Sequence, residues 1–139
     1  MTPRVQARRL LPGWQRRLRL GDWQVAVSDL EPEADSRSNV DYDVTLRRAV
    51  IRLLGNTPPS QIERQLVHEL LHVRFALATW AWDQTRVHTP PAFDGPNKAM
   101  WNVGMEAGIE AVVDALGCAP RAEWGAESPE FISAFPVSP

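Results

Sequence analysis

Residues 67–72 read Val-His-Glu-Leu-Leu-His, and this stretch constrains the fold more than any other part of the chain. On an α-helix, His68 and His72 are one turn apart and share a face, so both imidazoles can bind one metal ion. Glu69 lies beside them, where a carboxylate can accept a proton from a metal-held water. A catalytic metal needs a third protein ligand, so a second element must lie opposite this helix.

The segment around this motif carries the strongest helix signal in the chain. Ser60 is a good N-cap residue, and Glu63 three positions later completes a capping-box pattern. Apolar side chains then recur at helical spacing and form a wide face: Ile62, Leu66, Val67, Leu70, Leu71, Phe75 and Leu77. The pattern predicts a helix from about residue 60 to 79, with the two histidines near its middle.

About three strands are expected before this helix, and the last of them is either a separate strand or the continuation of the second. Residues 23–27 and 40–46 alternate apolar with small or polar side chains, and residues 49–54 form a compact β-branched run. Residues 29–39 are rich in Asp, Glu, Ser and Asn and predict a loop.

Helical and irregular segments make up the rest of the chain. Residues 3–19 carry a partial helical stripe that Pro12-Gly13 interrupts, so one kinked helix or two short ones are expected. Residues 80–97 contain several prolines and two tryptophans and predict a loop with aromatic anchors. A further helix is expected from residue 97 to 116, and Gly117 suits its C-terminal cap. These elements predict an α+β fold.

The length of 139 residues fits one domain, for which we expect residues 1–116, followed by a proline-rich tail at 117–139. Cys118 is the only cysteine, so an intramolecular disulfide is impossible and a reducing compartment is favoured. The N-terminus lacks a signal-peptide pattern, and no run of apolar residues is long enough to cross a membrane. A cytoplasmic location without membrane contact is therefore expected.

The basic residues are concentrated at the N-terminus. Residues 1–20 hold six arginines and no acid, and the other 119 residues therefore carry −8, because the whole chain is at −2. This overall charge argues against a dedicated nucleic-acid binder. We interpret the basic segment, expected to be helical, as a solvated helix face rather than a phosphate or partner contact.

The third metal ligand is not evident from the motif itself. An extended motif with Gly and His at the following positions is excluded, because Phe75 and Ala78 stand there. His88 is a lone histidine in a Pro-flanked segment and is a weak candidate. The helix at 97–116 offers Glu106, Glu110 and Asp114, each one turn apart.

Two pairings fit a glutamate ligand with a carboxylate one turn later that supports a histidine. The first has Glu106 as the ligand with Glu110 behind it, and the second has Glu110 with Asp114 behind it. Glu106 lies nearer the apolar stripe of its helix, whereas the literal Glu-x-x-x-Asp spacing favours Glu110. A purely solvated acidic face is the alternative to both.

The chain resembles small zincin-like metallopeptidases of the gluzincin type, including compact proteins encoded in phage and prophage genomes. The resemblance covers most of residues 14–116 and lies in four segments: Asp22 to Val27, Ala49 to Leu53, Val67 to His72, and Glu110 to Asp114. It implies a minimal zincin-like domain with a small sheet packed on the motif helix and a glutamate-bearing helix. It also implies a zinc ion held by His68, His72 and Glu110, with Asp114 in support, and Glu106 as the alternative ligand. The strand at 49–53 would be the edge that pairs with an extended peptide.

The predicted function is that of a zinc-dependent peptidase in which Glu69 is the general base and the substrate is a peptide or protein. The alternative is a zinc-binding accessory or regulatory protein that does not cleave. Tyr42, Arg86 and His88 are conceivable donors to an oxyanion, and none of them is assigned that role. Trp80 and Trp82 follow the motif helix and could line a substrate cleft.

Overall fold

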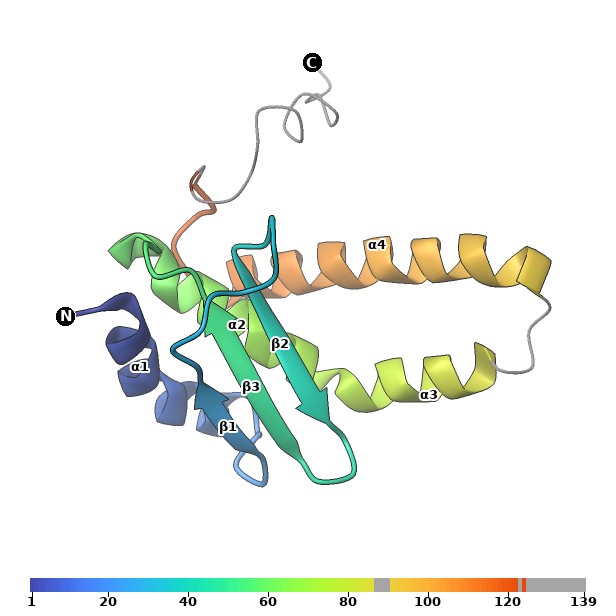
Figure 1. Cartoon of the computed structure of the whole chain (residues 1–139), viewed down its shortest axis with the longest axis horizontal. Helices are drawn as coiled ribbons and strands as arrows, with labels where there is room; N and C mark the ends of the chain where they lie inside the picture. Colours follow the sequence, from blue (N-terminus) through green and yellow to red (C-terminus); the bar gives the residue numbers. More distant parts are fainter. Residues whose placement is uncertain (87–90, 123, 125–139) are drawn as a thin grey trace, which may run out of the picture.

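The computed structural model describes residues 1–86, 91–122 and 124. The described elements, in chain order, are α1 (Pro3–Arg17), β1 (Gln24–Val27), β2 (Ser38–Asp43), β3 (Arg48–Leu53), α2 (Pro59–Arg74), α3 (Ala76–Arg86) and α4 (Pro91–Ala115). They form a mixed fold of helices and one three-stranded sheet, which confirms the predicted α+β class (Figure 1). Among the described residues, no helix combines the length and the apolar character that a membrane crossing requires.

The sheet has the strand order β1-β3-β2. β1 pairs with β3 in parallel, from Gln24 opposite Arg48 to Val27 opposite Ile51. β2 pairs with the other edge of β3 in antiparallel fashion. The expectation that residues 49–53 offer a free edge is therefore wrong, because β3 is the central strand and both its edges are occupied. The strand at the edge beside the motif helix is β2.

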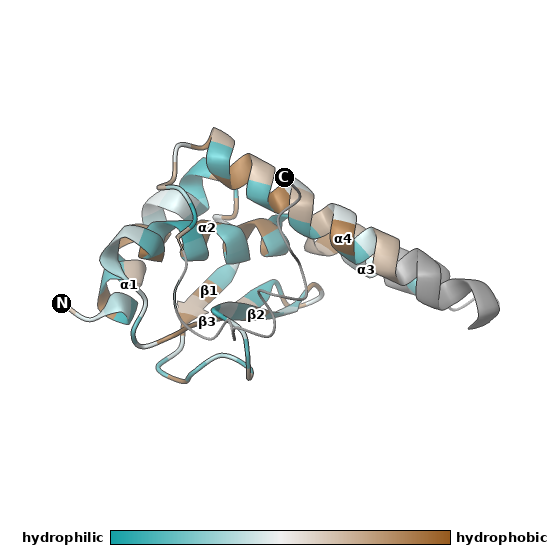
Figure 2. Ribbon diagram, turned by 90° about the horizontal axis from the view of Figure 1, so that it is seen from above, coloured by the Kyte–Doolittle hydropathy of each residue, from teal (hydrophilic) through white to brown (hydrophobic). Residues whose placement is uncertain are grey.

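Helices α1 and α2 cover one face of the sheet, as Figure 2 shows. Alternate residues of β3 (Ala49, Ile51 and Leu53) are buried, which is the period expected of a strand with one covered face. They join a core to which α2 contributes most of its apolar residues: Ile62, Leu66, Val67, Leu70, Leu71 and Val73. The motif helix is thus the central packing element of the fold.

Helix α1 runs without a break through Pro12, so the first helical segment is one helix and not two. Two of its arginines contact the chain just after β1. Arg4 pairs with Glu31 at 2.9 Å, and Arg8 pairs with Asp29 at 2.7 Å and donates to the Val27 carbonyl oxygen at the same distance. Part of the basic N-terminal segment therefore forms ion pairs within the protein.

The start of α2 differs from the capping box predicted at Ser60 and Glu63. The helix begins at Pro59, its N-cap is Pro58, and no side chain caps it. Proline is well tolerated at the first helical position, because its fixed φ fits a helix and its missing N–H would have no helical partner there. Glu63 instead accepts a hydrogen bond from Trp14 Nε1 at 3.1 Å, which ties α2 to α1.

The helical segment predicted at 60–79 is divided in two. Helix α2 ends at Arg74, Phe75 is its C-cap, and α3 follows from Ala76. The prediction of a loop at 80–97 is wrong for the described residues of that segment, because α3 continues to Arg86 and α4 begins at Pro91. Pro91 occupies the first position of its helix, where proline favours helix initiation rather than preventing it. Helices α3 and α4 extend away from the sheet in the same direction (Figure 1).

Gly117 follows α4 with a φ of 81°, in the left-handed region that glycine favours, as its predicted capping role requires. The residues after it lie against α2. The Gln61 side chain donates to the Pro120 carbonyl oxygen at 2.9 Å and accepts from the Ala122 N–H at 3.2 Å. The first residues of the predicted tail are therefore bound to the body of the protein.

Candidate metal centre

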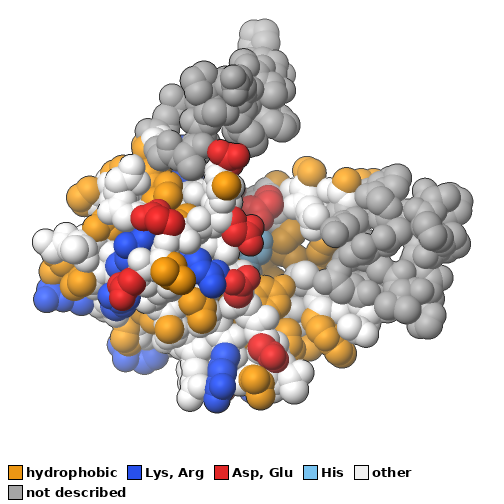
Figure 3. Space-filling view, viewed as in Figure 1, with side chains coloured by type: hydrophobic (Ala, Val, Ile, Leu, Met, Phe, Trp, Pro, Cys, Tyr) orange, Lys and Arg blue, Asp and Glu red, His pale blue; other side chains and the backbone are white. Residues whose placement is uncertain are grey.

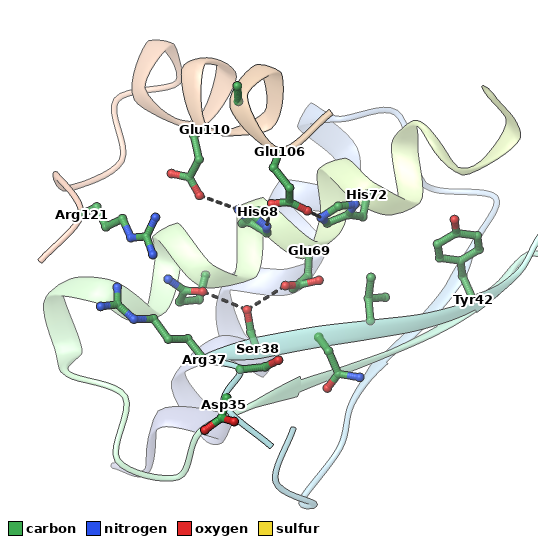
Figure 4. A pocket seen from close by; sticks show the side chains of 15 residues that line it. Asp35, Arg37, Ser38, Tyr42, His68, Glu69, His72, Glu106, Glu110 and Arg121 are labelled. Carbon is green, nitrogen blue, oxygen red and sulfur yellow. Dashed lines mark hydrogen bonds and ion pairs between the residues drawn. The ribbon is translucent and has the colours of Figure 1, made fainter. Parts of the chain in front are cut away.

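A cavity of about 550 Å³ lies between β2, α2 and α4. The motif residues His68, Glu69 and His72 line it from α2, and Glu106 and Glu110 line it from α4 (Figure 4). In the space-filling view a histidine is visible in a recess, with acidic side chains around it (Figure 3). The three motif side chains therefore share one solvent-reachable space.

The two histidines and Glu106 converge on one point. His68 Nε2 lies 3.2 Å from one carboxylate oxygen of Glu106, and His72 Nε2 lies 2.9 Å from the other. The imidazole centroids are 5.1 Å apart, as expected for neighbours one turn apart on a helix. Within the part of the chain that is described, His68, His72 and Glu106 form a group whose potential ligand atoms all lie within 4.8 Å of one another, so they could hold a metal ion.

Glu110 occupies a different position. Its Oε1 lies 2.8 Å from Nδ1 of His68, on the side of the ring away from Glu106. Its other oxygen pairs with Arg64, a residue of α2 whose side chain is 3% exposed. Arg64 also pairs with Asp114 at 2.7 Å and donates to the Ala119 carbonyl oxygen at 3.3 Å. A chain of contacts thus connects Asp114, Arg64, Glu110 and His68.

This geometry matches the first of the two pairings that the sequence allows. Glu106, given as the alternative ligand, faces both Nε2 atoms, and Glu110, the preferred ligand, contacts the opposite nitrogen of His68. Asp114 contacts Arg64 rather than a histidine. Glu106 and Glu110 lie one turn apart on α4, and it is Glu106 that faces both Nε2 atoms, whereas Glu110 contacts Nδ1 of His68.

The histidines and glutamates of the site stabilise one another's charged forms. Hydrogen bonds from His68 and His72 hold the pKa of Glu106 well below its ordinary value. The hydrogen bond from His68, assisted by Arg64 and opposed by burial, lowers the pKa of Glu110 to about 2. Burial lowers the pKa of His68, but hydrogen bonds to both glutamates outweigh it and raise that pKa to about 10. Both glutamates are therefore carboxylates, the form in which they bind cations.

Glu69 faces the cavity from within α2, between the two histidines, and is 4% exposed. The Ser38 hydroxyl, on β2, donates to Glu69 Oε1 at 2.7 Å and also lies 2.9 Å from the side-chain oxygen of Gln65. Burial raises the pKa of Glu69, and the charge of His68 and the Ser38 hydrogen bond oppose this. Ser38 therefore holds the carboxylate of Glu69 in one orientation toward the cavity.

Two of these residues were not singled out from the sequence. Arg64 is four residues before His68, so helical spacing alone places it on the same face, opposite the acidic helix. That spacing is a signal that could have found it. Ser38 lies 31 residues from Glu69, and only the packing of β2 against α2 brings them together.

The residues considered from the sequence as oxyanion donors or as lining of a substrate cleft do not all lie at the cavity. Tyr42 lines the cavity near His72 (Figure 4). Trp80 lies on α3 with half of its surface exposed and does not line this cavity. His88 and the side chains of Trp82 and Arg86 lie outside the described residues.

The donor set fits a divalent metal that prefers nitrogen and oxygen. Four ligands at about 2.0–2.2 Å around a tetrahedral ion lie roughly 3.4 Å from one another. The contacts of 2.9 and 3.2 Å between Glu106 and the histidines are close to this spacing. Glu110 engages Nδ1 of His68, which is how a supporting carboxylate directs Nε2 to a metal. The ligand atoms of His68, His72 and Glu106 all lie within 4.8 Å of one another, as a shared ion requires.

Replacing Arg64 by methionine should lower the free energy of unfolding by about 2 kcal/mol, measured by urea denaturation. The substitution leaves Glu110 and Asp114 without their shared partner, and the part-exposed carboxylates recover some hydration. Arg64→Lys should restore only part of the loss, because an ammonium cannot pair with two carboxylates as a guanidinium does.

Arg52→Met is the matched control. Arg52 pairs with Asp41 on the exposed side of the sheet, so its loss should cost less than about 1 kcal/mol. Equal unfolding midpoints for the Arg64 and Arg52 variants would contradict a structural role for the network behind His68.

Comparisons of this chain with protein-family models, with curated proteins and with solved structures give no match. The case for its function therefore depends on the geometry of the site.

Proposed function

We propose that this protein is a zinc-dependent peptidase of the zincin type, with His68, His72 and Glu106 as the metal ligands and Glu69 as the general base. One observation carries the proposal. The cavity that holds a three-residue group able to bind a metal also holds a buried carboxylate, Glu69, fixed by a hydroxyl. A site that only stores a metal has no need of this fourth group, and burying a carboxylate costs free energy.

Each residue of the site has a separate role in the proposed reaction. Zinc, when bound, would polarise the peptide carbonyl and lower the pKa of a water toward 7. Glu69 takes the proton from the attacking water and gives it to the leaving amine. Ser38 keeps the Glu69 carboxylate oriented, and Glu110 with Arg64 keeps the imidazole of His68 oriented.

Strand β2 is where the substrate would lie. It is an edge of the sheet, and its residues Ser38, Asn39, Val40 and Tyr42 line the cavity. Asn39 Oδ1 is buried and accepts no hydrogen bond from the described residues, so it offers a peptide N–H an acceptor. An extended peptide added to this edge would pass along the two histidines.

The test is a metal and cleavage assay on the full chain. Protein purified without chelator should contain one zinc ion per chain by elemental analysis. It should also cleave a mixture of unstructured peptides, lose this activity with a chelator, and regain it when zinc is added. Absence of bound metal and of uptake on titration would refute the proposal. One zinc per chain without any cleavage would instead support the accessory role.

A further inference from the structure

A second cavity, of about 210 Å³, lies where the end of α1, the turn between β2 and β3, and the end of α2 meet. In Figure 1 this is the end of the sheet at which β2 and β3 are joined. None of the described residues lines both this cavity and the one that holds the histidines. His72 lines the first cavity, whereas Val73 and Arg74 line the second, so the two cavities lie on different sides of α2.

The wall of this second cavity is positively charged. Arg19 follows α1, Arg47 lies in the turn before β3, and Arg74 is the last residue of α2. Asp22 is the acidic residue of the wall, and it pairs with Arg47. Arg19 and Arg74 are exposed, and neither side chain forms an ion pair or a hydrogen bond with the rest of the described chain. These two guanidinium groups can therefore bind an anion.

The backbone at two of these arginines has a conformation that glycine favours. The φ angle is 55° at Arg19 and 53° at Arg47. A residue with a Cβ atom is strained in this region, so glycine or asparagine would suit the fold better at either position. Arg47 gains its ion pair with Asp22, whereas the exposed Arg19 side chain makes no such contact within the described residues. Strain of this kind without a structural gain points to a functional role for Arg19.

Apolar side chains complete the wall beside the arginines. Leu20 and Val73 are buried and belong to the hydrophobic core, so this part of the wall is fixed. Trp23 is partly exposed, and its indole N–H forms no hydrogen bond with the other described residues. Leu77 lies at the same cavity and is exposed. A ligand that suits this wall combines an anionic group with a ring that can contact apolar surface.

We propose that this cavity binds the terminal phosphate of a nucleotide, with the phosphate between Arg19 and Arg74 and the adjoining sugar and base against Trp23 and Leu77. A phosphate monoester carries a charge of about −1.5 to −2 and three acceptor oxygens, which suit two guanidinium groups better than a single carboxylate does. The cavity is smaller than the roughly 300–1,000 Å³ of sites that enclose a drug-sized ligand, so it takes the phosphate and leaves the base at its edge. The nucleotide can be free or can end a strand, because the same group is bound in both cases.

The surroundings of the cavity have the charge that such a ligand requires. Residues 14–24, 43–48 and 73–77 contain its wall, and together they hold six arginines and two acids. The chain as a whole has a net charge of −2, so the acidic residues are concentrated elsewhere. Arginines at the end of α1 are thus joined by others from distant segments, and the sum of their charges attracts a phosphate.

The test is a binding measurement that requires neither zinc nor cleavage. A short single-stranded oligothymidylate, labelled with fluorescein at one end and with a phosphate or a hydroxyl at the other, is titrated with full-length protein at low salt. Fluorescence anisotropy gives Kd. The phosphorylated strand should bind about 10- to 100-fold more tightly, because hydrogen bonds to charged groups are the strong ones. Equal Kd values for the two strands would overturn the proposal.

Competition identifies the source of the phosphate. Thymidine monophosphate that competes as well as the phosphorylated strand would show that the terminal nucleotide is the whole ligand. Weaker competition by the mononucleotide would show that the rest of the strand also binds, and either result supports the proposal. Inorganic phosphate or a phosphoserine peptide that competes as well as thymidine monophosphate would overturn the assignment to a nucleotide.

Two substitutions test the residues of the site. Arg74→Gln and Arg19→Asn should each reduce the preference for the phosphorylated strand at least about fivefold. Asparagine tolerates the positive φ at position 19, so this variant loses the charge while the fold is retained. Arg9→Gln is the matched control, because Arg9 is exposed on α1 and does not line the cavity. A preference that neither variant alters, or that Arg9→Gln reduces equally, would overturn the proposal.

The phosphate site and the proposed peptidase can be tested independently. Arg74 does not line the cavity of the histidines, so Arg74→Gln should leave zinc content and peptide cleavage unchanged. Binding of the phosphorylated strand that depends on Arg74 supports the phosphate site even if the protein cleaves nothing. Cleavage together with equal binding of both strands would overturn the phosphate site alone.

Discussion

Replacing Glu106 by glutamine should weaken zinc binding on the order of 100-fold, and His72→Ala should do the same. A zinc site with four ligands is worth roughly 10–16 kcal/mol, so one ligand accounts for about 3 kcal/mol, which is ~100-fold in Kd. Both side chains place a ligand atom at the point of convergence. Zinc affinity would be measured by competition with a chromophoric chelator at fixed pH.

Glu110→Gln provides the comparison that decides between the two glutamates. Glu110 supports His68 through Nδ1, so its substitution should weaken zinc about 10-fold, less than the loss of a ligand. Glu33→Gln, an exposed substitution with the same charge change, should have no effect. A larger loss of affinity for Glu110→Gln than for Glu106→Gln would reverse the assignment and restore the pairing of Glu110 with Asp114.

Glu69→Gln should abolish peptide cleavage while zinc binding changes by less than about threefold. A glutamine has the shape of the carboxylate, and its side-chain oxygen can still accept the hydrogen bond from Ser38. It cannot take a proton from water, and loss of a general base typically costs about 100- to 10,000-fold in rate. The measurement is kcat/KM on a cleaved peptide, with zinc content determined on the same preparation.

Glu63→Gln is the matched control for this substitution. Glu63 is on the same helix but binds Trp14 at the other end of α2, outside the cavity. It should retain full activity, with only a small change in stability. Cleavage by the Glu69 variant at the wild-type rate, with zinc in place, would remove Glu69 from the proposed mechanism and leave the base unidentified.

The local elements were the most predictable part of this fold. The three strands lie within a few residues of their predicted bounds, because alternation of apolar side chains depends only on neighbouring positions. Two of the predictions that failed concern prolines. Pro59 and Pro91 begin helices, whereas Ser60 was predicted as an N-cap and residues 80–97 as a loop. A proline disrupts the interior of a helix but favours its first position. Where a helix begins depends on its packing, so the sequence does not show which of these effects applies.

The candidate site was predictable in part. The spacing of His68, Glu69 and His72 placed all three on one helix, and this is a local property. Ser38 was not predictable, since its contact with Glu69 depends on how β2 packs against α2. The edge strand was mistaken for the same reason: the sequence of β3 cannot show that β1 and β2 occupy both of its sides.

The sequence by itself determined that two histidines and a glutamate share one turn of a helix, and this spacing restricts what that part of the helix can bind. It also limited the third ligand to one helix with acids one turn apart. Only the tertiary structure showed that Glu106, rather than Glu110, faces the Nε2 atoms of both histidines, by setting how far α4 is shifted along α2. A shift of α4 by one helical turn, about 5.4 Å, would exchange the places of the two glutamates, and the packing of distant residues fixes that shift.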